Sequence, residues 1–152
     1  MIREAKCHDA ESIQYLIRIF SETGKVLFRS LDEIRGNTPD FQVYEKNDQI
    51  VGVCSLKTGW GRFVELRSLG VDPRYSGQGI GTKMIEASIE TALLTDCDTL
   101  FVLTYSVSMF ERLGFSIVAK ETLPHKVWND CEACLHQTNC DETAMILSLV
   151  VK

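Results

Sequence analysis

The feature that most constrains this chain is a glycine-rich turn that joins an apolar strand to a long amphipathic helix. Three of the five residues from Gly77 to Gly81 are glycine, so the backbone can approach a ligand without Cβ clashes. Backbone N–H groups at the start of a helix attract an anion. The turn therefore predicts a pyrophosphate-binding site, with an ordinary tight turn as the structural alternative.

Two other phosphate-binding loops do not fit these residues. The loop of a nucleoside triphosphatase ends in Gly-Lys-Ser/Thr, whereas Gly81-Thr82-Lys83 stands here. A dinucleotide-binding turn follows the first strand of a parallel unit, but this turn lies near the middle of the chain, after several strand-like segments.

Hydrophobic periodicity and turn signals predict alternating strands and helices. Asp9 is expected to cap a first helix that ends at Gly24, Ser30 opens a capping box for a second helix, and Asn47-Asp48 is expected to turn a hairpin. The remaining helices are expected at residues 79–94 and 107–113, and the strands at residues 1–5, 41–45, 50–56, 63–71, 100–103, 115–119 and 145–151. This order predicts an α/β fold with a mixed central sheet and helices on both faces.

Length and composition indicate one globular domain over residues 1–152, with a polar, Cys-rich insertion at about 123–141. Of the 152 residues, 45% are hydrophobic and 24% are charged. The net charge of −5 argues against nucleic-acid binding. No apolar run has the length of a signal peptide or a membrane span, so a cytoplasmic protein without membrane contact is expected.

The residues around the turn resemble the GNAT superfamily of N-acetyltransferases. The first GNAT signature is Arg/Gln-x-x-Gly-x-Gly/Ala after an apolar strand. It is matched by Ser76-Gly77-Gln78-Gly79-Ile80-Gly81, with Ser76 in place of Arg or Gln. The second signature, an aromatic residue followed by x-x-x-Gly-Phe, is matched by Phe110-Glu111-Arg112-Leu113-Gly114-Phe115.

This resemblance implies a mostly antiparallel central sheet, acetyl-CoA as cosubstrate, and transfer of the acetyl group to an amine. It also implies that the strand end, the turn and the aromatic residue of the second signature bind the coenzyme. These residues are Leu69, Gly70, Val71, Ser76, Gly77, Gln78, Gly79, Ile80, Gly81, Thr82 and Phe110.

Within that superfamily the chain resembles the acetyltransferase domain of bacterial N-acetylglutamate synthases. Residues 26–31, 65–71 and 100–104 carry the resemblance, and residues 123–128 are similar to the tail of short, stand-alone members. The resemblance implies the α-amine of glutamate as the acceptor, with Arg29, Arg67 and Lys126 as substrate-binding residues. Tyr105 stands where the synthases have an arginine, so Lys126 or His125 could supply that charge instead.

An amine must lose a proton before it attacks the thioester, so the reaction needs a base. Glu65 lies six residues before Val71, and this even spacing predicts that both side chains share one face of the strand, about 20 Å apart. Glu65 matches the base of histone-type members in register and is expected to act through water or on a bent strand, with a solvated carboxylate at the strand end as the alternative.

Two further groups have expected roles in the transfer. The Val71 N–H is expected to stabilise the oxyanion. Phe110 stands where the family often has a tyrosine that protonates the thiolate, so Tyr105 is the nearest substitute. The competing interpretation of Tyr105 is a packed aromatic at a strand end.

The six cysteines are expected to be thiols or metal ligands rather than disulfides. Cys131, Cys134 and Cys140, with His136 or His125, could complete a zinc site. Because Cys-x-x-Cys occurs once, a metal-free lid is the alternative, and no metal is predicted. The other cysteines lie in or beside apolar runs and are expected to be buried: Cys7, Cys54 and Cys97.

Three functions follow from these observations. The first is acetylation of glutamate or a similar acidic amino acid, the second is acetylation of another small amine, and the third is acyl-CoA binding without catalysis. The expected partner is a small amine or amino acid. The oligomeric state stays open, with a homodimer as one option.

Overall fold

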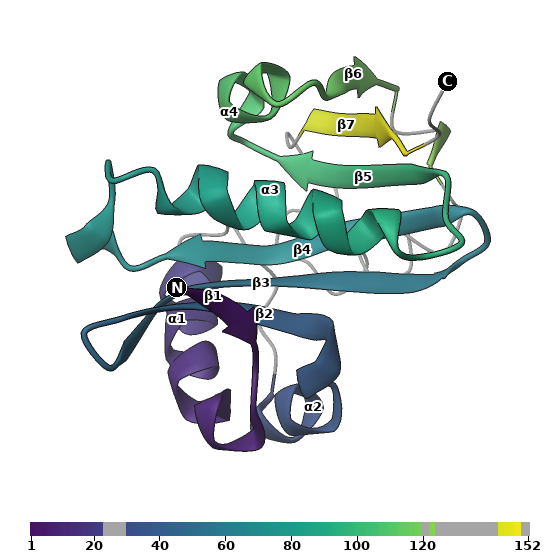
Figure 1. Ribbon diagram of the computed structural model, residues 1–152. Helices are drawn as coiled ribbons and strands as arrows, with labels where there is room; N and C mark the ends of the chain where they lie inside the picture. Colours follow the sequence, from purple (N-terminus) through teal and green to yellow (C-terminus); the bar gives the residue numbers. More distant parts are fainter. Residues whose placement is uncertain (23–29, 120–121, 124–142, 150–152) are drawn as a thin grey trace.

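The computed structural model describes residues 1–22, 30–119, 122–123 and 143–149. Seven strands form one sheet in the order β1-β2-β3-β4-β5-β7-β6 (Figure 1). β4 and β5 are parallel, and the other neighbours are antiparallel. This confirms the predicted mixed, mostly antiparallel sheet. The strands are β1 (Ile2–Glu4), β2 (Phe41–Lys46), β3 (Gln49–Trp60), β4 (Phe63–Val71), β5 (Thr99–Thr104), β6 (Ser116–Val118) and β7 (Thr143–Ser148).

Helices cover both faces of this sheet, as predicted (Figure 1). α1 (Ala10–Glu22) and α2 (Leu31–Gly36) share an apolar cluster on one face. On the other face, α3 (Ile80–Leu93) and α4 (Val107–Arg112) contribute to a second cluster. Short 3-10 turns precede α1, β2 and α3: η1 (Cys7–Asp9), η2 (Thr38–Asp40) and η3 (Pro73–Tyr75).

A glycine lets α3 lie close to the sheet. Met84 and Ile85 of α3 are fully buried in the cluster that also holds Leu66 of β4. A Cβ at Gly52 of β3 would lie only 2.7 Å from Met84 Sδ and 3.3 Å from Ile80 Cγ2, so a side chain there would force the packed side chains of α3 to shift.

Local signals in the sequence account for two chain reversals. The Ser30 hydroxyl accepts a hydrogen bond from the Glu33 N–H at 3.1 Å and caps α2, as predicted. Asn47 and Asp48 have φ of 52° and 63°, the left-handed pair of a tight hairpin turn, which confirms the hairpin between β2 and β3.

Several expectations need correction. Asp9 ends η1 and accepts from the Lys6 N–H at 2.8 Å, so its carboxylate closes the turn before α1 instead of capping α1. β3 extends to Trp60, and β7 starts earlier than residue 145. Cys54 is buried as expected, but Cys97 is only partly buried and Cys7 is exposed.

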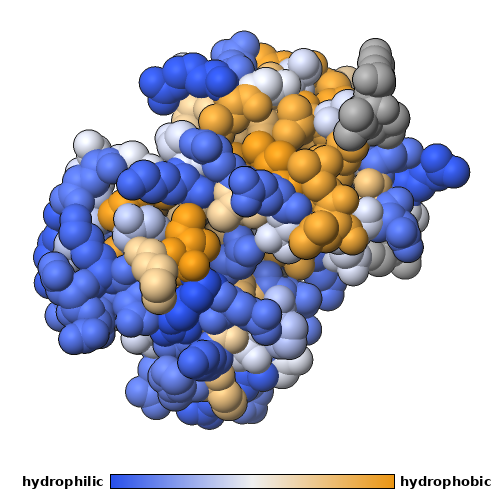
Figure 2. Space-filling view, in the orientation of Figure 1, coloured by the Kyte–Doolittle hydropathy of each residue, from blue (hydrophilic) through white to orange (hydrophobic). Residues whose placement is uncertain are grey.

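Apolar side chains are unevenly distributed over the face of the molecule that Figure 2 shows. Figure 2 shows apolar side chains gathered over the upper part of the molecule and mainly hydrophilic ones below. Leu93 and Leu94, at the end of α3, and Ile117 of β6 are among the exposed apolar residues. Of the helices in the described part of the chain, none combines the length and the apolar character needed to cross a bilayer.

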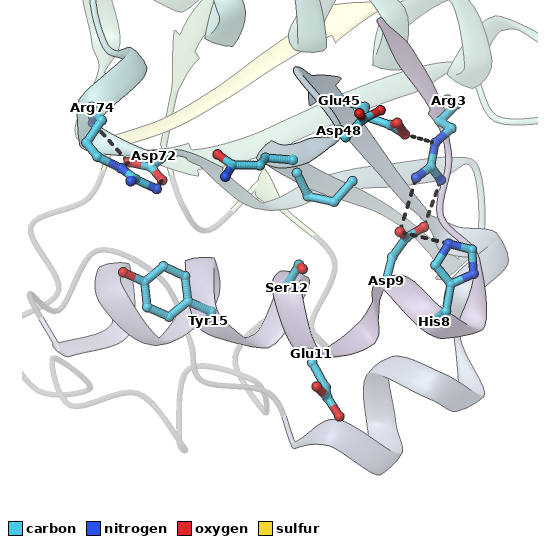
Figure 3. Close-up of a pocket in the computed structure, with 12 residues that line it drawn as sticks. Arg3, His8, Asp9, Glu11, Ser12, Tyr15, Glu45, Asp48, Asp72 and Arg74 are labelled. Carbon is cyan, nitrogen blue, oxygen red and sulfur yellow. Dashed lines mark hydrogen bonds and ion pairs between the residues drawn. The ribbon is translucent and has the colours of Figure 1, made fainter.

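One arginine links strand β1 to η1, the turn before α1, and to the β2–β3 hairpin. Arg3 donates to both oxygens of Asp9, at 2.7 and 3.1 Å, and to Glu45 Oε1 at 2.9 Å (Figure 3). Asp9 is 4% exposed, and the hydrogen bond from Arg3 holds its pKa below the ordinary value of a carboxyl. A carboxyl whose pKa is lowered by folding stabilises the fold above its unfolded-state pKa.

Asp9→Asn should therefore lower the free energy of unfolding at neutral pH by about 1–3 kcal/mol, because Arg3 loses one of its two charged partners. The wild-type advantage should shrink as the pH falls below about 4, toward the folded-state pKa of Asp9. Urea unfolding of both proteins at pH 7 and at about pH 2.5 measures this, with Glu11→Gln, which removes an exposed carboxylate in the first turn of α1, as the control. A difference that does not change with pH would contradict the role of the ion pair.

Candidate active site

β4 and β5 pair over three residues and then diverge. Their parallel register runs from Phe63↔Thr99 to Glu65↔Phe101. β4 nevertheless continues to Val71, still paired with β3 on its other side. We call the opening between residues 66–71 of β4 and residues 102–104 of β5 the fork. Its vertex is the last pair of residues at which the two strands are still joined, Glu65↔Phe101.

The backbone of β4 offers hydrogen-bonding groups to the fork. The Asp72 N–H donates to the Val51 carbonyl at 2.7 Å. Successive N–H groups of a strand point to alternate sides, so the Val71 N–H points away from β3 and into the fork. An extended ligand with amide groups can pair with this edge as an added strand.

A bulge interrupts β4 within the fork. Val53 of β3 pairs with Gly70, but Ser55, two residues along β3, pairs with Arg67, three residues back along β4. Ser68 has φ of 58°, which is uncommon for a residue with a side chain. The additional residue changes which face of the sheet the following side chains occupy.

This bulge overturns the prediction that Glu65 and Val71 share a face. Val71 pairs with Gly52, whose missing side chain would meet Met84 of α3. Glu65 pairs with Lys57, five residues further along β3 and therefore on the opposite face. The even spacing in the sequence becomes an odd spacing in the strand, so Glu65 lies on the face that α1 covers.

The glycine turn, residues 76–82, leads from the open end of the fork into α3. Gly77 and Gly79 both have φ of 78°, and Gly79 is the N-cap of the helix. Asp72 holds the preceding residues, because its carboxylate accepts from the Arg74 backbone N–H at 2.9 Å and from its guanidinium at 2.9 Å. The hydrogen bond from the Arg74 side chain lowers the pKa of Asp72. The turn thus holds free N–H groups of a helix start beside the fork, where an anion can bind.

The other predicted turn residues differ in what their side chains do. The Ile80 side chain is buried in the core, and the Ser76 hydroxyl donates to the Pro73 carbonyl at 3.0 Å. Thr82 is half-buried in the first turn of α3. A Cβ at Gly81 would lie 3.7 Å from Met109 Sδ and 3.8 Å from Val71 Cγ2, so a side chain there would extend toward the mouth of the fork.

Two predicted site residues meet at the vertex. Glu65 is 8% exposed, and its Oε1 lies 3.7 Å from Arg67 Nε on the same face of β4. An acid and a cation therefore lie together beside Phe101, whereas Val71 lies at the other end of the fork.

The two predicted aromatic residues lie in different surroundings. Tyr105 follows the end of β5 and is 40% exposed. Phe110 is buried in the core, where its ring packs edge-to-face on Phe115 with centroids 5.0 Å apart. The Phe110 side chain therefore leaves little surface for the predicted coenzyme contact.

The remaining predictions fall on residues outside the described part of the chain. They are Arg29, His125, Lys126, Cys131, Cys134, His136 and Cys140. Within the described ranges, the structure has no group of three His, Cys, Asp or Glu side chains suited to a metal ion.

A polar pocket of about 670 Å³ lies between α1 and the β2–β3 hairpin (Figure 3). Tyr15 and Ser12 of α1 point into it, and the Asp72–Arg74 pair lies at one end. The ion pairs of Arg3 lie at the other end (Figure 3). No motif in the sequence marks this pocket, because its lining comes from four separate segments.

The structure places one further residue beside the glycine turn, and no sequence motif marks it. Lys46, the last residue of β2, donates from Nζ to Gln78 Oε1 at 2.7 Å, and Nζ lies 5.6 Å from the centre of the Tyr75 ring. The hairpin signal at Asn47-Asp48 places Lys46 near a hairpin tip. The position of that tip beside the turn depends on sheet packing, which has no local signal.

Comparison with known proteins agrees with this combination of fork and glycine turn. Residues 6–115 match the sequence model described as the Acetyltransferase (GNAT) family. The chain belongs to this family. The predicted GNAT acetyltransferase, an enzyme that takes acetyl from acetyl-CoA, is thereby confirmed.

Relatives of this GNAT acetyltransferase include amino-acid acetyltransferases. An N-acetyltransferase of Chlorobaculum tepidum is 31% identical over 148 residues, which cover 97% of this chain and 96% of that protein. An amino-acid acetyltransferase of Mycobacterium tuberculosis is 27% identical over 134 residues, which cover 86% and 76%. The amino-acid acetyltransferases of Neisseria meningitidis are longer, and the match covers 29% of their length.

Solved structures show the same fold. N-acetylglutamate synthase of Neisseria gonorrhoeae, in complex with coenzyme A and N-acetyl-glutamate, superimposes with a TM-score of 0.88 at 24% identity. That match covers 99% of this chain and 35% of the synthase chain. A Mycobacterium tuberculosis protein in complex with CoA superimposes with a TM-score of 0.85 at 23% identity and is covered to 99%.

Gly81→Glu should weaken binding of coenzyme A by about tenfold or more while the protein stays folded. Gly81 has no left-handed φ, so a side chain is tolerated, but the carboxylate would repel an anion at the turn. Gly81→Gln is the matched control, with nearly the same shape and no charge. Calorimetric titration with coenzyme A and a thermal melt measure both effects. Equal affinities of Gly81→Glu and wild type would contradict the turn as the phosphate site.

Proposed function

We propose that this acetyltransferase acetylates the α-amine of glutamate or a similar acidic amino acid. The observation that carries the proposal is the Glu65–Arg67 pair at the vertex of the fork, where a base and a cation lie 3.7 Å apart. An amino acid presents an amine and a carboxylate close together, and this pair offers one group for each. The amino-acid acetyltransferases among the relatives support the same class of acceptor.

The coenzyme enters from the open end of the fork. Its pyrophosphate binds the N–H groups of the glycine turn, and its pantetheine arm pairs with the edge of β4 along Leu69, Gly70 and Val71. The arm then runs from the turn toward the vertex. The thioester therefore lies on the Glu65 side of Val71.

This direction changes the expected role of the Val71 N–H. Val71 and Glu65 are separated by six residues of strand, about 20 Å if fully extended, so one acetyl group cannot contact both. In our proposal the Val71 N–H binds the arm near its phosphate end. The thioester carbonyl accepts from a backbone N–H nearer the vertex, where it stabilises the oxyanion.

The transfer itself needs one proton acceptor. The amine of the acceptor loses its proton to Glu65, through water, and its lone pair attacks the thioester carbon. The new C–N bond forms, the C–S bond breaks, and coenzyme A leaves as a thiolate, which takes up the second proton that the nitrogen releases as the amide forms. A thiol of ordinary pKa near 8.5 leaves without obligatory acid catalysis, so Tyr105 at the end of β5 is at most an assisting proton donor.

Three cations are proposed to bind the carboxylates of the acceptor: Arg67, Arg29 and Lys126. Arg67 lies on the same face of β4 as Glu65, with 3.7 Å between its Nε and Glu65 Oε1, which supports a role for its guanidinium beside the reacting amine. The planar guanidinium group of Arg29 suits bidentate binding of a carboxylate. The Tyr105 position, which lacks the arginine of the synthases, favours a second candidate, a small amine other than glutamate.

Glu65→Gln should lower kcat by about a hundredfold or more, because the neutral amide cannot take the proton. The affinity for acetyl-CoA should change little, and the acidic limb of the pH–rate profile should be lost. Glu90→Gln, on the exposed side of α3, is the control for removal of a carboxylate. An unchanged pH–rate profile would leave Glu65 as a structural residue.

The acceptor is tested by turnover of acetyl-CoA with glutamate, glutamine and γ-aminobutyrate, the last of which lacks the α-carboxylate. We expect the highest kcat/KM with glutamate. Arg29→Ala should cut that value by about ten- to a hundredfold, as expected for loss of a charge-assisted pair, and should affect γ-aminobutyrate less. Equal losses for both amines would contradict recognition of the α-carboxylate, and turnover of neither would favour the non-catalytic alternative.

A further inference from the structure

The glycine turn has an unusual distribution of charge for a site that binds a polyanion. The first signature position, where the family has Arg or Gln, is Ser76, and its hydroxyl donates to the Pro73 carbonyl within the turn. Arg74, two residues earlier, is paired with Asp72 at 2.9 Å. Neither residue therefore offers an uncompensated cation to a phosphate, in a chain of net charge −5.

Lys46 places a cation at this turn from a distant part of the sequence. Its Nζ donates to Gln78 Oε1, and Gln78 lies between the two left-handed glycines, Gly77 and Gly79. The Nζ also lies 5.6 Å from the centre of the Tyr75 ring, within the range of a cation–π contact. Both contacts hold the ammonium beside the backbone that forms the anion site.

The contact also fixes the orientation of the Gln78 amide. An ammonium can only donate hydrogen bonds, so the atom that faces Lys46 must be the amide oxygen. The amide NH₂ group of Gln78 then points away from Lys46 and is available as a donor. An ammonium has three N–H bonds, and the one to Gln78 leaves two that can reach a phosphate oxygen.

We propose that Lys46 binds a phosphate group of the coenzyme and supplies the charge that Ser76 lacks. The phosphate could be the pyrophosphate or the 3′-phosphate, since both present the same oxygens to an ammonium. This inference rests on acetyl-CoA as the donor and is independent of which amine accepts the acetyl group. A lysine acts at such a site as a point charge, whereas an arginine would bind the phosphate through two parallel hydrogen bonds.

The test compares wild type with Lys46→Met and Lys46→Arg. Lys6→Met is the matched control, because Lys6 is exposed and follows β1 at the end of β2 opposite to Lys46. Lys46→Met should weaken acetyl-CoA binding about three- to tenfold at low salt, as expected for a partly exposed charged hydrogen bond. The penalty should shrink at high salt, Lys46→Arg should recover most of the affinity, and Lys6→Met should bind like wild type.

Truncated donors separate a phosphate contact from a merely structural effect on the turn. Each protein is titrated with acetyl-CoA, acetyl-3′-dephospho-CoA and S-acetylpantetheine, which has no phosphate. A penalty that disappears with the dephospho donor assigns Lys46 to the 3′-phosphate. If the loss of affinity in Lys46→Met persists with acetyl-3′-dephospho-CoA and disappears with S-acetylpantetheine, Lys46 binds the pyrophosphate. A penalty that is absent with acetyl-CoA, or equal for all three donors, would overturn the proposal, and neither result would affect the identity of the acceptor.

Discussion

The pairing between β4 and β5 ends at Glu65↔Phe101, and the position of the whole candidate site depends on where it ends. Both strands stay fixed on their outer sides, β4 by β3 and β5 by β7, so they can separate without losing their places in the sheet. An unpaired strand edge inside a sheet leaves N–H and C=O groups without partners, which favours a ligand that can supply them. The fork therefore has the chemistry of a site for an extended, amide-containing arm.

Three local features align the ends of this opening. The bulge at Ser68 turns Val71 toward α3 while Glu65 stays on the face of α1. Gly52 allows α3 to pack closely on the sheet, which brings the start of α3 to the open end of the fork. Left-handed backbone at Gly77 and Gly79 then directs the turn into the helix. The glycine turn, our proposed phosphate site, thus lies at one end and the buried Glu65 at the other, a separation that suits a long phosphorylated coenzyme.

Much of this arrangement could be predicted from the sequence, because the decisive signals are local. The glycines of the turn, the Ser30 cap and the Asn47-Asp48 hairpin each depend on a few neighbouring residues, and each forms as expected. The face of Glu65 could not be predicted, since a bulge adds one residue to a strand without a clear sequence signal. The contact between Lys46 and Gln78 joins residues 32 apart and arises from the order of strands, which periodicity alone does not determine.

Amide hydrogen exchange with and without coenzyme A tests most directly whether the fork and the turn form the coenzyme site. The account predicts that coenzyme A slows exchange at Val71 and at the amides of the glycine turn, residues 77–81, and that β6, at the edge of the sheet, is unaffected. Protection should be weaker in Gly81→Glu. Protection confined to the pocket between α1 and the hairpin, with none at Val71 or the turn, would contradict it.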